Sequence, residues 1–173
     1  MSSIAEQKFL ADWDALCRDP RFDNFPYKIE LTEHGKIMMS PASNDHAMLQ
    51  VLVIQLLTKL LPNGFGGSEL AILTSSGVRV PDVCWCRNAA DFLQLRGEVA
   101  ALKAPEICVE IISASNSLAE MDQKRDLYFE AGCQEFILVD RKTFVTFFGP
   151  EGQVQESAFA PGFPAKIEFP GKA

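Results

Sequence analysis

Two acidic residues stand inside runs of apolar residues that have the composition of buried strands. Glu110 lies in residues 107–112 (ICVEII), and Asp82 lies in residues 78–86 (VRVPDVCWC). A buried carboxylate is costly unless it meets a positive partner or binds a cation. The two runs therefore predict either a pair of neutralised acids or a site that holds a cation.

Each acid also has a plainer explanation. Glu110 could lie at the exposed carboxyl end of its strand and pair with a surface lysine, although ligand sites of open α/β sheets gather at such ends. Asp82 follows Pro81, and an aspartate after proline is common in turns. For Asp82 alone we favour the turn, but a second acid in a similar run and the lysine described next favour a shared site.

The third candidate is a lysine on the apolar half of a helix predicted over residues 118–131. At ~100° per residue, apolar side chains fill one half of this helix: Leu118, Met121, Leu127, Tyr128 and Ala131. Lys124 falls in the middle of that half. An inward ammonium needs a carboxylate partner or a substrate phosphate, whereas the alternative is a side chain that snorkels along the helix to water.

Three further polar residues are weaker candidates for the same site. Glu120 points inward four residues before Lys124, but Ser117-Leu118-Ala119-Glu120 fits the S-x-x-E capping box. We interpret Glu120 as a cap that could also hold Lys124. Glu30 and His46 lie at the edges of apolar elements, and no spacing argument singles out either of them.

The elements that must position these residues follow from the hydrophobic pattern. Helices are predicted over residues 3–17, 47–61 with a cap near residues 43–45, about 91–102, and 118–131. Strands are predicted over residues 27–31, 36–39, 69–73, 78–86, 106–113, 135–140 and 143–148. Pro81 predicts a bend or an edge within residues 78–86. The fold class is therefore α/β, a mixed β-sheet flanked by helices, with residues 106–112 and 135–140 most buried.

Size and composition predict one globular domain over residues 1–173, because 173 residues suffice for one core and not for two ordinary domains. The most apolar stretch, residues 47–61, is shorter than a bilayer requires, so we expect no membrane segment. The N-terminal residues lack the apolar core of a signal peptide, so we expect a cytoplasmic protein. Cys84, Cys86 and Cys108 lie in strand-like runs and are interpreted as reduced core residues rather than disulfide or zinc ligands.

The net charge of −7 is the opposite of the basic surface expected of a protein that neutralises many phosphates alone. It argues against tight, unaided DNA binding. It does not argue against metal-assisted chemistry on a phosphate, because a bound cation reverses the local field that the substrate meets.

The sequence resembles the PD-(D/E)XK nuclease superfamily and, within it, a large bacterial family of restriction-endonuclease-like proteins. Four stretches carry the resemblance, in this order: YKIELTEHGKIMMSP, GVRVPDVCWC, APEICVEIISASNS and MDQKRDLYFEAGCQEFILVD. Together they cover most of the chain, and their order is more specific than an isolated Pro-Asp with a distant Glu. The resemblance implies a restriction-endonuclease-like sheet flanked by helices.

The resemblance also implies roles for the candidate residues. Asp82 and Glu110 would bind Mg²⁺ or Mn²⁺, with the backbone carbonyl of Ile111 as a further ligand. The superfamily carries a lysine two residues after the glutamate, where this chain has Ile112. In the resembling family a lysine of the following helix takes that place, which matches Lys124.

Glu30 and His46 match polar positions beside the site in that family and are expected as helpers. The activity implied is metal-dependent endonucleolytic hydrolysis of DNA phosphodiester bonds, with nucleic acid as the partner. Two alternatives stay open: a catalytically inactive module for assembly or nucleic-acid association, and a phosphoesterase that acts on a small nucleotide. Cutting both strands of a duplex would favour a homodimer, although no segment of the sequence marks an interface.

Overall fold

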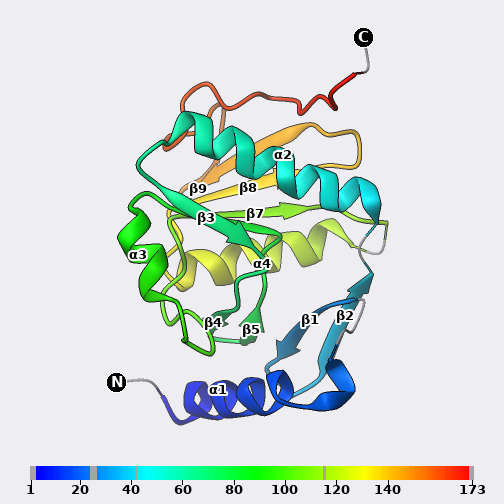
Figure 1. Ribbon diagram of the computed structural model, residues 1–173, viewed down its shortest axis with the longest axis vertical. Coiled ribbons are helices and arrows are strands. Elements are labelled where there is room, and N and C mark those ends of the chain that lie inside the picture. Colours follow the sequence, from blue (N-terminus) through cyan, green and yellow to red (C-terminus); the bar gives the residue numbers. More distant parts are fainter. Residues whose placement is uncertain (1–2, 24–26, 42, 115, 172–173) are drawn as a thin grey trace.

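The structure of the chain is a computed structural model that describes residues 3–23, 27–41, 43–114 and 116–171. The helices are α1 (Ile4–Cys17), the 3₁₀ turn η1 (Pro20–Phe22), α2 (Asn44–Leu60), α3 (Ala89–Gln94) and α4 (Leu118–Glu130). The strands are β1 (Tyr27–Thr32), β2 (Ile37–Pro41), β3 (Phe65–Ser68), β4 (Ile72–Thr74), β5 (Gly77–Arg79), β6 (Val83–Cys86), β7 (Ile107–Ile111), β8 (Glu135–Val139), β9 (Val145–Gly149) and β10 (Gly152–Val154). Figure 1 shows their arrangement.

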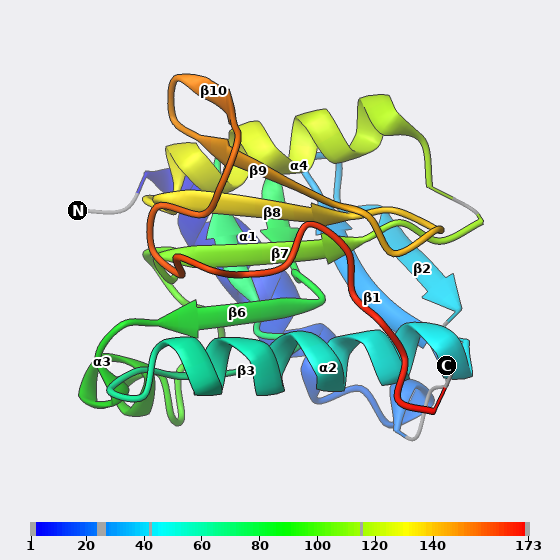
Figure 2. The same ribbon diagram turned by 90° about the horizontal axis from the view of Figure 1, so that it is seen from above.

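The larger sheet has the order β10-β9-β8-β7-β6-β3, in which β7 and β8 are parallel and the other neighbours antiparallel. Helix α2 covers one face and α4 the other (Figures 1 and 2). Because side chains alternate along a strand, Ile107 and Val109 of β7 pack with α2, whereas Cys108 packs with Tyr128 of α4. The predicted α/β class, a mixed sheet flanked by helices, is confirmed.

A second, antiparallel sheet was not anticipated from the sequence. It has the order β2-β1-β5-β4 and packs against α1 through Phe9 and Trp13, beside Leu31 and Val78. The predicted strand over residues 78–86 is in fact two strands, with β5 in the small sheet and β6 in the large one. Since Pro81 has no N–H to donate, the ladder breaks there and the chain passes from one sheet to the other.

Other predicted elements differ from the observed ones at their ends. The helix predicted over residues 91–102 is the short α3, and the strand predicted over residues 69–73 is replaced by β3 and β4 on either side of Glu69. Glu69 has φ 57°, so the chain turns between those strands. Leu118, assigned to the apolar half of α4, is the first residue of the helix and is 68% exposed.

Two further predictions concerned a membrane-spanning segment and the state of the cysteines. Within the described residues, no helix combines the length and the apolar character that crossing a bilayer demands. The five cysteines are free, and Cys84, Cys86 and Cys108 are buried as predicted. Burial raises the pKa of the Cys84 thiol to about 12, so it is a protonated core residue at neutral pH.

Candidate metal centre

The two acids that stood out in the sequence meet at the junction of the two sheets. Asp82 precedes β6, and Glu110 lies in the neighbouring antiparallel strand β7. The pairing of Val83 with Val109 places Asp82 beside Glu110. Both carboxylates are buried, with exposed fractions of 1% and 2%. Glu110 is therefore not the exposed strand end of its plainer explanation, and Asp82 lies in a bend after Pro81, as its plainer explanation has it, but buried.

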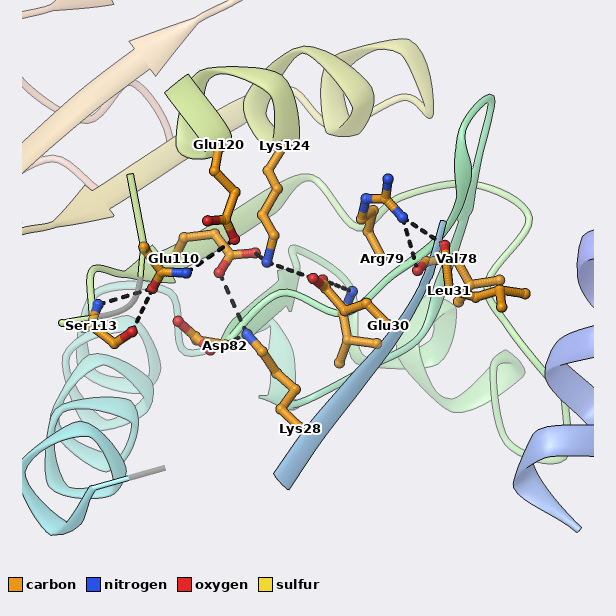
Figure 3. A network of polar contacts seen from close by, with 12 residues as sticks. Lys28, Glu30, Leu31, Val78, Arg79, Asp82, Glu110, Ser113, Glu120 and Lys124 are labelled. Atoms are coloured by element: carbon orange, nitrogen blue, oxygen red, sulfur yellow. Dashed lines mark hydrogen bonds and ion pairs between the residues drawn. The ribbon is translucent and has the colours of Figure 1, made fainter. Parts of the chain in front are cut away.

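A lysine that the sequence analysis missed lies between these carboxylates. The ammonium of Lys28, from β1, is 2.5 Å from Asp82 Oδ1 and 3.6 Å from Glu110 Oε2 (Figure 3). One signal could have found it: Lys28 lies two residues before Glu30 in the same strand, so the two side chains share a face. The small sheet thus brings a cation to the acids of the large one.

Lys124 points inward from α4, as its position on the helix predicts. Its Nζ lies 3.2 Å from Glu110 Oε1 and 2.9 Å from Glu30 Oε2. Glu30 is fixed in turn, because its Oε1 accepts a hydrogen bond from the Val80 backbone N–H at 2.8 Å. Tyr128, one helical turn after Lys124, donates its hydroxyl to Glu110 Oε1 at 2.7 Å. The helix therefore supplies two donors to one carboxylate oxygen.

His46 and Ile111 approach Asp82 from two other elements. His46 lies in the first turn of α2, and its Nε2 is 3.1 Å from Asp82 Oδ1. The Ile111 N–H, at the end of β7, donates to Asp82 Oδ2 at 2.7 Å. The backbone of Ile111 thus lies next to the aspartate, while the role of its carbonyl as a ligand stays a prediction.

The structure places the Glu120 side chain with Asn116 rather than with Lys124. Its Oε1 accepts a hydrogen bond from Asn116 Nδ2 at 3.0 Å, and its N–H donates to Ser117 Oγ at 3.1 Å. Among the described residues, the carboxylates within ion-pair distance of Lys124 are those of Glu110 and Glu30. Glu120 therefore belongs to the start of α4, where Ser117 caps the helix, and the idea that it holds Lys124 is wrong.

The electrostatics of the site push its two central acids in opposite directions. Burial raises the pKa of Glu110 above its usual range, although Lys124 and Lys28 partly offset this effect. Burial opposes ionisation of Asp82 too, but the hydrogen bond from His46 and the charge of Lys28 outweigh it and lower the pKa. The ammonium groups stay charged, because neighbouring acids outweigh the burial and raise the pKa of both Lys28 and Lys124.

A family model described as "Uma2: Putative restriction endonuclease" matches residues 11–168. The chain belongs to the Uma2 family. Among solved structures it is similar to "a putative nuclease belonging to DUF820 from Anabaena variabilis ATCC 29413", with 20% identity and a TM-score of 0.67. That match covers 86% of this chain and 90% of the other, and shows that the two share a fold. No curated protein matches the chain.

The site of this Uma2 chain fits a magnesium-type ion better than a zinc-type one. Within the described residues, no group of three or more His, Cys, Asp or Glu side chains is arranged to hold a metal. Two carboxylates that already share one cation are nevertheless the side-chain set that Mg²⁺ needs, because Mg²⁺ keeps several waters and takes further oxygens from substrate phosphate. Asp82 and Glu110 would hold such an ion.

Space for small ligands adjoins the carboxylates. A cavity of about 20 Å³, lined by Asp82, Glu110 and both lysines, has room for about one water molecule. A larger cleft of about 420 Å³ lies alongside it, and Pro41, His46 and Ser113 line both. A substrate in the cleft would reach the buried site past His46.

Proposed function

We propose that this Uma2-family chain is a metal-dependent nuclease that hydrolyses DNA phosphodiester bonds, with Mg²⁺ or Mn²⁺ held by Asp82 and Glu110. One observation carries the proposal: two buried carboxylates, one in β7 and one directly before its neighbour β6, share a single cation beside a cleft. Burying two acids together is costly, so a purely structural role would be better served by apolar residues. Membership of the Uma2 family supports the nuclease reaction.

When bound, the metal ion would polarise the phosphate and lower the pKa of a water molecule. The chain's own part is to position charge. Lys124 has three ammonium protons, and Glu110 and Glu30 each accept one. The third remains for an attacking water or a phosphate oxygen, and the two carboxylates hold the ammonium in place for that contact.

His46 is placed to act at the mouth of the site. Its side chain is 15% exposed, borders both the small cavity and the larger cleft, and contacts Asp82 through Nε2. An imidazole in that position can move a proton between the cleft and solvent while its other nitrogen stays hydrogen-bonded. We assign His46 a helper role, and Asp82 and Glu110 remain the proposed metal ligands.

Cleavage of a supercoiled plasmid with 5 to 10 mM Mg²⁺ or Mn²⁺ (roughly saturating for such sites) tests the proposal. Asp82→Asn and Glu110→Gln should each lower the cleavage rate by about a hundred-fold or more, since each removes a charge that the metal needs. Lys124→Met should lose cleavage too, yet keep metal binding. Asp126→Asn, an exposed acid on the far side of α4, is the matched control and should cleave like the wild type.

One outcome of the plasmid assay would contradict the nuclease proposal. If wild type and the Asp82→Asn variant nick DNA equally slowly, with circular dichroism showing both folded, the chain is an inactive module and the proposal is wrong.

The acidic surface favours a second candidate, hydrolysis of a small nucleotide phosphoester. A net charge of −7 repels a long polyanion more strongly than a mononucleotide or dinucleotide. Comparing kcat/KM for a dinucleotide with that for a duplex decides between the two substrates. Cutting both strands would also require two copies of this single site, which sedimentation with and without duplex would detect.

A further inference from the structure

Lys28 occupies the position between the carboxylates that the proposed metal ion would need. Its ammonium lies against Asp82 Oδ1 and faces Glu110 Oε2, while the other oxygen of each carboxylate is already used. Asp82 Oδ2 accepts from the Ile111 N–H, and Glu110 Oε1 accepts from Lys124 and Tyr128. A metal would therefore take Glu110 Oε2 and Asp82 Oδ1, the two oxygens that Lys28 faces; His46 Nε2 also lies 3.1 Å from Asp82 Oδ1.

The charges of the cluster argue against a divalent ion and the Lys28 ammonium lying beside the two carboxylates at the same time. Three buried carboxylates, from Asp82, Glu110 and Glu30, face two ammonium groups, which leaves one net negative charge. A divalent ion in place of Lys28 makes the cluster neutral. The same ion beside Lys28 leaves an excess positive charge and two cations a few ångströms apart in a buried site, which is strongly unfavourable.

A second cleft next to Lys28 could accept its side chain if a metal ion displaced it. Its side chain is 10% exposed and also lines a second cleft, of about 230 Å³, on the side of α1. Glu69 is exposed and lines both this cleft and the small cavity beside Asp82 and Glu110. A lysine stem that pivots on β1 can leave the carboxylates and keep an acidic neighbour in water, so displacement does not strand a buried charge.

We propose that Lys28 is a built-in competitor of the metal: its ammonium neutralises Asp82 and Glu110 in the metal-free protein and must leave when a divalent cation binds. Resting on the proposed function, this assigns Lys28 a positioning role rather than a catalytic one. It explains how two acids stay folded together without metal. It also makes metal affinity depend on a residue that is not a ligand.

The test is Mn²⁺ binding by isothermal titration calorimetry, with electron paramagnetic resonance of free Mn²⁺ as a second reading, at pH 8 so that protons do not replace the ammonium. Lys28→Met keeps the length of the stem and removes the charge. It should bind Mn²⁺ about ten-fold or more tightly than the wild type, because the metal no longer breaks a buried ion pair. Lys36→Met, the same change at an exposed lysine between β1 and β2, should leave the Kd unchanged.

A crystal structure of the wild-type protein with Mn²⁺ gives an answer that does not require the variant to fold. The Lys28 ammonium should then lie farther from Asp82 than an ion pair allows. Equal Kd values for wild type and Lys28→Met, or an ammonium still against Asp82 beside bound Mn²⁺, would overturn the role of Lys28 and leave the nuclease proposal standing. Absence of Mn²⁺ binding by wild type and variant alike would overturn both.

Discussion

At the scale of single residues, the site consists of charges of alternating sign that are fixed by different elements. Glu110 comes from the large sheet, Asp82 from the bend that leads into it, Lys28 and Glu30 from the small sheet, and Lys124 from α4. Two neighbouring acids whose pKa values are shifted in opposite directions are typical of sites that divide proton-handling roles. Here the division follows the contacts: the donors to Asp82 outweigh its burial, whereas burial of Glu110 outweighs the charges of Lys124 and Lys28.

The lowered pKa of Asp82 predicts how stability depends on pH. An acid whose folded pKa lies below its ordinary value of 3.8 stabilises the fold above that pH, and this contribution is lost as pH falls through the folded pKa. Asp82→Asn should therefore destabilise the protein at pH 6, by on the order of 2 kcal/mol for lost charge-assisted hydrogen bonds. Below about pH 4 the difference should shrink toward zero.

Urea unfolding at pH 3, 4, 5 and 6 (about one pH unit apart, to span the acid range) measures this difference. Replacing Asp82 also removes a negative charge that helps to raise the pKa of Glu110, so the trend across the four pH values is the reading rather than the difference at any one of them. Asp12→Asn, at the exposed Lys8–Asp12 pair, is the control and should change stability by less than about 1 kcal/mol at every pH. A destabilisation by Asp82→Asn that stays constant from pH 6 to pH 3 would contradict the assigned ionisation.

At the scale of elements, helices and side-chain directions that depend on local sequence could be predicted, whereas contacts that depend on which strands pair could not. Helix α4 was predicted to within one residue, and its 3.6-residue period alone showed that Lys124 points inward. The pattern at Lys28 is weaker: it shares a strand face with Glu30, but a lysine in a short strand is ordinarily a solvated residue. Only the pairing of β1 with β5, and the passage of the chain through Pro81 into β6, brings it to Asp82.

The same reasoning explains the misplaced strands. Residues 69–73 read as one apolar run, but the positive φ of Glu69 turns the chain between β3 and β4. A glutamate rarely adopts that conformation, so composition could not predict the turn. Strand β1 itself was predicted, but its pairing with β5 in a second sheet was not.

Gly77 is the residue on which the β1–β5 pairing most depends. It has φ 110°, pairs with Thr32, and leaves no room for a Cβ against the Leu31 carbonyl oxygen. Gly77→Ala should lower the free energy of unfolding by about 3 kcal/mol or more, since it adds backbone strain to a clash with backbone atoms. Mn²⁺ affinity should change as well, because β1 carries Lys28 and Glu30.

Gly35→Ala provides the comparison that separates strain from clash. Gly35 also has a positive φ, 69°, but an added Cβ there meets nothing within 4 Å. It should cost only about 1 kcal/mol and leave metal binding unchanged. Thermal unfolding of both variants measures the difference, and equal destabilisation would show that the close approach of β5 to β1 is not what positions the site.

At the scale of the whole molecule, the site is buried and the protein around it carries a net negative charge. Its contact with a polyanion is therefore expected to be narrow, confined to the cleft lined by His46, Ser113 and Arg141. The Arg141 guanidinium is itself engaged, since it donates to the carbonyls of Ser113 and Ala114 at 3.1 and 3.0 Å. The 16 Lys and Arg residues are outnumbered by 23 Asp and Glu residues, so the net charge of −7 opposes phosphate contacts elsewhere on the chain.

The salt dependence of duplex binding should accordingly be shallow. Each phosphate contact contributes a slope of about −0.9 to log K against log salt, so a cleft of this size predicts a total slope no steeper than about −3. Fluorescence anisotropy of a labelled duplex from 50 to 200 mM KCl (roughly the range over which counterion release is measured), with Ca²⁺ in place of Mg²⁺ to bind without cutting, measures it. A slope of about −6 or steeper would mean that the protein covers long DNA through an extended surface, and that the cleft beside Asp82 and Glu110 is only part of the substrate site.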